Sequence, residues 1–212
     1  MMALEHGIAR LVEEFIAAGR PSSRQQNIDD RRAGYVASAV LAGESETRVQ
    51  VDDITLEGIN FRVVSPQNAA GPLPTVIYYH GGCFVSGGFA THDKQWRQLA
   101  YDSGCRVIAV QYRLAPEQTF PAAHDDAERG AQIIRRHAEA LGVDTSQITL
   151  AGDSAGGNLA LVTALRLKAA GAWLPAQLIL IYPMLDATAA SASYVSNGED
   201  YIITRDTLDR KS

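Results

Sequence analysis

Apolar side chains near the start of the chain recur at the spacing of an α-helix. In residues 3–19 they lie three or four positions apart, and the following Gly-Arg-Pro is expected to end that helix. A second helix is expected over 27–41, before Gly43. Both helices precede the first predicted strand, so residues 1–43 are interpreted as an addition to a sheet domain, a packing arm rather than a lid.

The pattern changes to strands after this arm. Residues 47–65 alternate between apolar and polar positions around Glu57-Gly58, which predicts a β-hairpin. Short continuous apolar runs then alternate with helical stretches, which is typical of right-handed βαβ units and a parallel sheet covered by helices. The expected strands are 75–79, 106–110, 147–151 and 177–182, and the expected helices are 91–103, 122–140 and 154–171. The fold class predicted is therefore α/β, with helices on both faces of a mostly parallel sheet.

One strand-to-helix junction carries chemistry. The pentapeptide Gly152-Asp153-Ser154-Ala155-Gly156 follows a strand and opens a helix, and it fits the G-x-S-x-G pattern of a nucleophile elbow. A serine in such a strained turn needs neighbours without bulk, which explains Gly152 and Gly156. Ser154 is the predicted nucleophile, and Asp153 is interpreted as a structural residue that holds the elbow.

A second motif follows the strand at 75–79. Acyl transfer needs backbone N–H groups aimed at the oxygen that becomes negative, and they typically come from the residue after the serine and from the loop after the third strand. The predicted oxyanion hole is therefore Gly81, Gly82, Cys83 and Ala155. His80 is expected to shape that loop. The carboxyl ends of neighbouring parallel strands share one edge, so the two motifs should lie together.

The motifs together resemble the hormone-sensitive-lipase-like (bacterial family IV) esterases of the α/β-hydrolase superfamily. The resemblance is carried by Gly-Asp-Ser-Ala-Gly-Gly at 152–157, His80-Gly81-Gly82, and the segments 112–117, 120–123 and 180–183. It implies an N-terminal helical cap segment at 1–43, a hydrolase core at 44–186 and the start of a second cap segment at 187–212, with a helix expected near Thr204. It also implies a serine carboxylesterase for short or medium acyl chains, with a small ester as substrate and no metal or cofactor. Cys83 stands where the family has a third glycine, but it still offers a backbone N–H.

The rest of the catalytic triad is harder to place. The family orders it as Ser, Asp and His, and no histidine follows His137. The expectation is therefore that the C-terminal strands, the triad Asp and the triad His are absent, so that this chain alone is weak or inactive. His124 is a candidate replacement base, but a solvated histidine at a helix start is the preferred interpretation. His92 and His137 are interpreted as helix-surface residues, and Asp186 is a weak candidate for the acid.

Two other functions stay open. One is a non-catalytic pseudo-hydrolase that binds a small ligand, which the intact elbow disfavours. The other is a fragment completed by a second chain. An uncovered apolar sheet edge at 177–182 predicts self-association, including homo-oligomers.

Composition excludes several classes of protein. The net charge is −5 and no basic block occurs, so nucleic acid is an unexpected partner. Cys83 and Cys105 belong to no C-x-x-C pair, and no two histidines have metal-ligand spacing. Neither a signal peptide nor a membrane-spanning run is evident, so the expected location is cytoplasmic.

Overall fold

The computed structural model describes residues 5–19, 25–186, 188 and 190–198. Residues 32–184 form one compact unit, and the described residues on either side of them belong to a second. The helix expected near Thr204 lies outside the described residues. None of the helices in the described ranges is both long and apolar enough to cross a membrane.

The larger unit is built on a six-stranded sheet of order β1-β2-β4-β3-β5-β6. The hairpin strands β1 and β2 are antiparallel, β2 is antiparallel to β4, and the pairs β4–β3, β3–β5 and β5–β6 are parallel. The strands are β1 Val49–Leu56, β2 Ile59–Pro66, β3 Leu73–Tyr79, β4 Arg106–Gln111, β5 Val143–Asp153 and β6 Gln177–Ile181.

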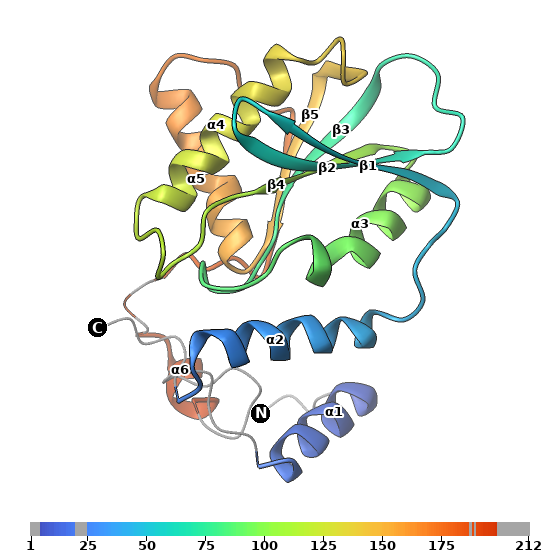
Figure 1. The fold of residues 1–212 in the computed structure, drawn as a ribbon. Coiled ribbons are helices and arrows are strands. Elements are labelled where there is room, and N and C mark those ends of the chain that lie inside the picture. The colour runs from blue at the N-terminus through green and yellow to red at the C-terminus, as the bar shows by residue number, and fades with distance from the viewer. Residues whose placement is uncertain (1–4, 20–24, 187, 189, 199–212) are drawn as a thin grey trace. The chain divides into compact units, whose positions relative to one another are not determined.

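Helices cover both faces of this sheet (Figure 1). Helix α3 (Phe89–Ser103) packs on one face, and α4 (Ala122–Arg136) and α5 (Ala155–Ala169) pack on the other. Outside this layered core the helices are α1 His6–Ala17, α2 Ile28–Ser38 with the 3-10 turn Ala39–Ala42, and α6 Ala192–Ser196. The α/β class and the helices on both faces are confirmed.

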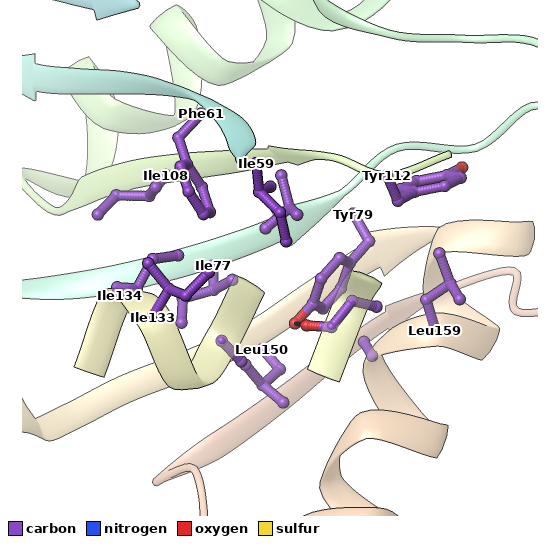
Figure 2. Packing of buried hydrophobic residues seen from close by; sticks show 14 of the residues in the cluster. Ile59, Phe61, Ile77, Tyr79, Ile108, Tyr112, Ile133, Ile134, Leu150 and Leu159 are labelled. Atoms are coloured by element: carbon purple, nitrogen blue, oxygen red, sulfur yellow. Dashed lines mark hydrogen bonds between the residues drawn. The ribbon is translucent and has the colours of Figure 1, made fainter. Parts of the chain in front are cut away.

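Strand β3 shows why the centre of the sheet is rigid. Its side chains alternate between the faces, so Val76 and Tyr78 join the α3 cluster while Ile77 and Tyr79 join the α4–α5 cluster. Figure 2 shows Ile77 and Tyr79 among the side chains of the cluster that packs against α4 and α5. The Tyr79 hydroxyl donates to the Ala127 carbonyl at 2.9 Å, which satisfies the one polar group of this buried side chain. The exit of β3 is therefore fixed on both sides.

Strand β6 has a different environment. It is an edge strand of the described sheet, and Leu178, Ile179 and Ile181 are 39%, 42% and 39% exposed.

Strand β5 differs in extent from its prediction, because it begins at Val143 rather than near Gln147. Val143 pairs with Leu73 ahead of a register shift, so the extra residues continue the sheet.

Candidate active site

Ser154 lies on a sharp turn between β5 and α5. Its backbone angles are φ 53° and ψ −115°, a conformation that costs a non-glycine residue on the order of 1–3 kcal/mol. The turn is held from three directions: the Ser154 N–H donates to the Ile181 carbonyl at 2.9 Å, and the Ser154 carbonyl accepts from the N–H groups of Asn158 (3.2 Å) and Met184 (3.0 Å). A strained conformation held by so many bonds is typical of a functional serine.

The two glycines of the pentapeptide have no room for a side chain. A Cβ on Gly156 would collide with the carbonyl oxygen of Tyr79, and one on Gly152 would collide with the Gly156 backbone. The start of α5 therefore packs directly on the end of β3. Tyr79 and Gly152 are paired in the parallel register, so the loop after β3 and the elbow after β5 leave the same edge of the sheet together.

The loop after β3 is a compact turn with unusual backbone. Gly82, Cys83 and Phe84 have φ values of 129°, 55° and 60°, and the N–H groups of Val85 and Ser86 both donate to the Gly82 carbonyl. A Cβ on Gly82 would collide with the Ser86 carbonyl oxygen. Only glycine fits there, whereas Cys83 adopts its positive φ at an energetic cost.

His80 supports this loop from inside the protein. Its Nδ1 lies 2.8 Å from the Gly81 carbonyl oxygen, and the Tyr112 hydroxyl donates to the His80 carbonyl at 2.6 Å. The His80 and Tyr112 rings stack with their centroids 4.3 Å apart. Burial lowers the pKa of His80 to about 4, so the imidazole is neutral near pH 7 and can donate to the carbonyl through Nδ1–H.

Asp153 connects the elbow to the same loop. Its side chain is 8% exposed, and its Oδ1 accepts from the Gly81 N–H at 3.0 Å and from the Tyr78 hydroxyl at 3.1 Å. The Gly81 N–H is therefore bonded to Asp153, while the N–H of Ala155, the first residue of α5, has no partner within its helix. Gly81, which was expected to contribute to the oxyanion hole, therefore uses its N–H group to anchor the loop to Asp153.

The interpretation of His92 as a helix-surface residue is wrong. His92 is 3% exposed, and its Nε2 lies 3.3 Å from Asp153 Oδ1. The pattern that could have revealed this is the buried stripe of α3, because His92, Trp96 and Ala100 recur every four residues and all are buried. The position of His92 within this stripe, rather than its residue type, indicates burial.

The interpretation of His124 as a solvated residue is also wrong. His124 is half-buried, and its Nε2 lies 3.0 Å from Asn158 Oδ1. Its ring stacks on that of Phe84, with the two ring centroids 5.4 Å apart. Asn158 in turn donates through Nδ2 to the Met184 carbonyl at 2.8 Å. His124 therefore bridges α4 to the elbow. His137 directly follows α4; its side chain is 39% exposed, and its Nε2 lies 3.3 Å from Glu57 Oε1.

Asp186 is the last candidate for the triad acid. Asp186 belongs to the other unit, where it accepts a hydrogen bond from the Thr188 N–H, and hydrogen bonds from Thr188 lower its pKa. Among the described residues, no group of three or more His, Cys, Asp or Glu side chains is arranged to hold a metal ion. The structure thus brings Ser154, Ala155 and the loop 80–83 together.

Residues 76–211 match the sequence model of a protein family that is described as having the α/β-hydrolase fold. The chain is 34% identical to ethyl acetate hydrolase from Pseudomonas putida, and the match covers 94% of this chain and 66% of that protein. It is 36% identical to carboxylesterase NlhH from Mycobacterium tuberculosis, and this match covers 77% of this chain and 52% of that protein. It superposes on an ester hydrolase from the metagenome of Lake Arreo, bound to a bipyridine phosphonate derivative, with a TM-score of 0.88 and 37% identity over 98% of this chain and 69% of that one.

The chain belongs to the α/β-hydrolase family, in its hormone-sensitive-lipase-like (bacterial family IV) branch. It spans between about half and two thirds of the length of the two curated relatives named above. Both relatives, and the solved structure, are named as enzymes that hydrolyse esters.

Proposed function

We propose that the protein hydrolyses carboxylic esters of short or medium acyl chains, with Ser154 as the nucleophile. The single observation that carries this proposal is the strained, glycine-flanked backbone of Ser154 at the junction of β5 and α5. The names of the relatives support the reaction class. The proposal concerns the whole protein, and its location is proposed to be cytoplasmic.

In this mechanism the Ser154 Oγ attacks the carbonyl carbon of the ester and loses its proton to a general base. The oxygen of the tetrahedral intermediate accepts hydrogen bonds from the N–H groups of Gly82, Cys83 and Ala155, which cost no reorganisation when they are already in place. Collapse of the intermediate expels the alcohol, which takes the proton from the base. Water then attacks the acyl group on Ser154 and releases the acid.

The general base is the part of the site that the described contacts leave open. Within residues 5–19, 25–186, 188 and 190–198, no histidine is hydrogen-bonded to Ser154 Oγ. His92 and His124 are engaged with Asp153 and Asn158. This observation favours a second candidate function, the binding of a small ester or its analogue without turnover.

Hydrolysis of p-nitrophenyl butyrate by the whole protein and by its Ser154→Ala variant distinguishes the two functions. The proposal expects a wild-type rate at least about 100-fold above that of the variant, since the nucleophile and the oxyanion hole act as a unit. Equal rates would contradict it. Equal rates together with saturable binding of the ester would support the second candidate.

We also propose that the exposed edge strand β6 mediates self-association. Among the described residues no strand pairs with its outer edge, and Leu178, Ile179 and Ile181 are half-exposed, so this edge forms a template on which another strand can pair. The proposed occupant is the β6 of a second copy.

A further inference from the structure

A buried carboxylate lies directly behind the proposed nucleophile. Asp153 accepts from groups on three different segments: the Tyr78 hydroxyl on β3, the Gly81 N–H in the following loop and His92 Nε2 on α3. Burial opposes ionisation of Asp153, but the hydrogen bonds from His92, Tyr78 and Gly81 outweigh it and lower the pKa below the usual range. The side chain is therefore an anion that depends on its donors.

His92 is the donor that no part of the proposed reaction uses. Its Nε2 is 3.3 Å from Asp153 Oδ1 and 3.5 Å from Oδ2, and its Nδ1 is 2.7 Å from Thr91 Oγ1. An ionised carboxylate only accepts hydrogen bonds, so Nε2 must carry a proton. The Thr91 hydroxyl also lies 2.9 Å from the Gly88 carbonyl oxygen, so its single proton is directed either to that carbonyl or to Nδ1 of His92.

Aromatic rings fix the orientation of this imidazole. The His92 ring stacks on Trp96 with their centroids 5.7 Å apart, and meets the edge of Tyr35 at 6.0 Å. The ring cannot turn away from Asp153 without breaking this packing. A fixed donor aimed at a carboxylate is the arrangement found behind functional groups that must be held accurately.

Gly81 transmits the position of this carboxylate to the loop. A Cβ on Gly81 would collide with Asp153 Oδ2, so the loop backbone packs against the carboxylate itself. Gly82 and Cys83, whose N–H groups are proposed to bind the oxyanion, follow Gly81 directly. Any shift of the Asp153 side chain therefore moves their N–H groups relative to Ser154.

We propose that His92 is a positioning residue, which acts through Asp153 and Gly81 to hold the oxyanion loop in register with Ser154. The inference rests on the proposed function of Ser154. Because the oxyanion forms only during the reaction, loss of the His92 donor lowers kcat and leaves KM nearly unchanged.

Two substitutions separate positioning from packing. His92→Leu fills the space without a donor, whereas His92→Gln retains an N–H group that reaches Asp153. His92→Leu is expected to lower kcat for p-nitrophenyl butyrate by about 10- to 100-fold. His92→Gln restores kcat to within about 5-fold of wild type, and KM stays within about 3-fold in both variants. His137→Leu, at a partly exposed position just after α4, is the matched control and leaves both constants unchanged.

Nuclear magnetic resonance supplies readouts that need no turnover. In the wild-type chain, Nε2 of His92 is expected to be protonated, and the Gly81 amide proton is expected to resonate downfield because it faces a carboxylate. The Gly81 resonance moves upfield in His92→Leu and stays in His92→Gln. An unprotonated Nε2 in the wild type, or an unchanged kcat and Gly81 resonance in a folded His92→Leu variant, would overturn the inference.

The same data separate this inference from the proposed function. Equal hydrolysis by wild type and Ser154→Ala contradicts the proposed function, and the Gly81 resonance then still decides whether His92 positions the loop. If His92→Leu fails to fold, the protonation state of His92 in the wild type decides instead.

Discussion

Two neighbouring parallel strands of the sheet, β5 and β6, end in different environments. The end of β5 is buried on both faces and leads into a turn where Gly152 and Gly156 have no space for a side chain. Strand β6 is exposed along most of its length, yet its last residue, Ile181, accepts a hydrogen bond from the Ser154 N–H. The elbow is therefore fixed mainly by β3 and β5, while β6 contributes backbone contacts and leaves its side chains exposed.

The largest effect on the free energy of unfolding is expected from a substitution that disturbs the close packing of α5 on β3. Gly156→Ala places a Cβ against the Tyr79 carbonyl oxygen, which cannot move because β3 lies at the centre of the sheet. We expect a loss of about 3 kcal/mol in the free energy of unfolding, measured by urea denaturation.

Gly34→Ala is the matched control for that substitution. Gly34 lies in α2, and an added Cβ would meet no atom within 4 Å. Alanine there is expected to stabilise by about 0.5–1 kcal/mol, because it restricts the unfolded chain and favours the helix. Equal destabilisation by both substitutions would mean that the contact with Tyr79 is not what limits residue 156.

A smaller effect is expected from pH at the same end of the sheet. Burial lowers the pKa of His80 to about 4, whereas an unfolded histidine titrates near 6.5. The unfolded chain therefore binds a proton that the folded protein excludes, so stability falls as pH drops from 6.5 towards 4. Between pH 7 and pH 5 the free energy of unfolding should fall by about 2 kcal/mol.

His80→Asn tests the origin of this pH dependence. The amide of asparagine retains a donor for the Gly81 carbonyl but does not titrate, so urea midpoints at pH 7 and pH 5 should differ less in the variant. Asp153 does not affect the comparison between pH 7 and pH 5. Its lowered pKa means that its contribution to the free energy of unfolding is lost only below about pH 4. A variant with the full wild-type slope would assign the effect to other groups.

The smallest expected effect on folding concerns β6. Ile179→Lys places a charge on a half-exposed edge strand, so it should change the free energy of unfolding by less than about 1 kcal/mol while it weakens self-association. Sedimentation equilibrium of the wild type and the variant measures this difference. Leu41→Lys, on a side chain that is 70% exposed outside the sheet, is the control and should leave association unchanged. Monomeric wild-type protein at all concentrations would contradict the proposal.

The sequence predicted the parts of this molecule that depend on local pattern. Continuous apolar runs marked the central strands because parallel strands are buried on both faces. The spacing of Gly152, Ser154 and Gly156 marked a turn that only small residues can make. Both signals are encoded within a few consecutive residues, so periodicity and turn chemistry were sufficient to find them.

Contacts between distant residues could not be found in this way. Asp153 and His92 are 61 positions apart in the sequence, and the bridge from His124 to Asn158 joins two helices. Residue type alone suggested solvated histidines, whereas His92 is buried and His124 is half-buried, each with a fixed hydrogen-bond partner beside the elbow. Likewise, the bond from the Gly81 N–H to Asp153 depends on the register of β3 and β5, which local pattern does not specify.

Covalent labelling tests the central claim, that Ser154 is a nucleophile beside an oxyanion hole, most directly. The whole protein is incubated with a p-nitrophenyl alkylphosphonate, and its peptides are mapped by mass spectrometry. We predict one phosphonate per chain, attached to Ser154, with no labelling of the Ser154→Ala variant. A wild-type chain whose Ser154 stays unlabelled, or a label that persists in the variant, would contradict the claim.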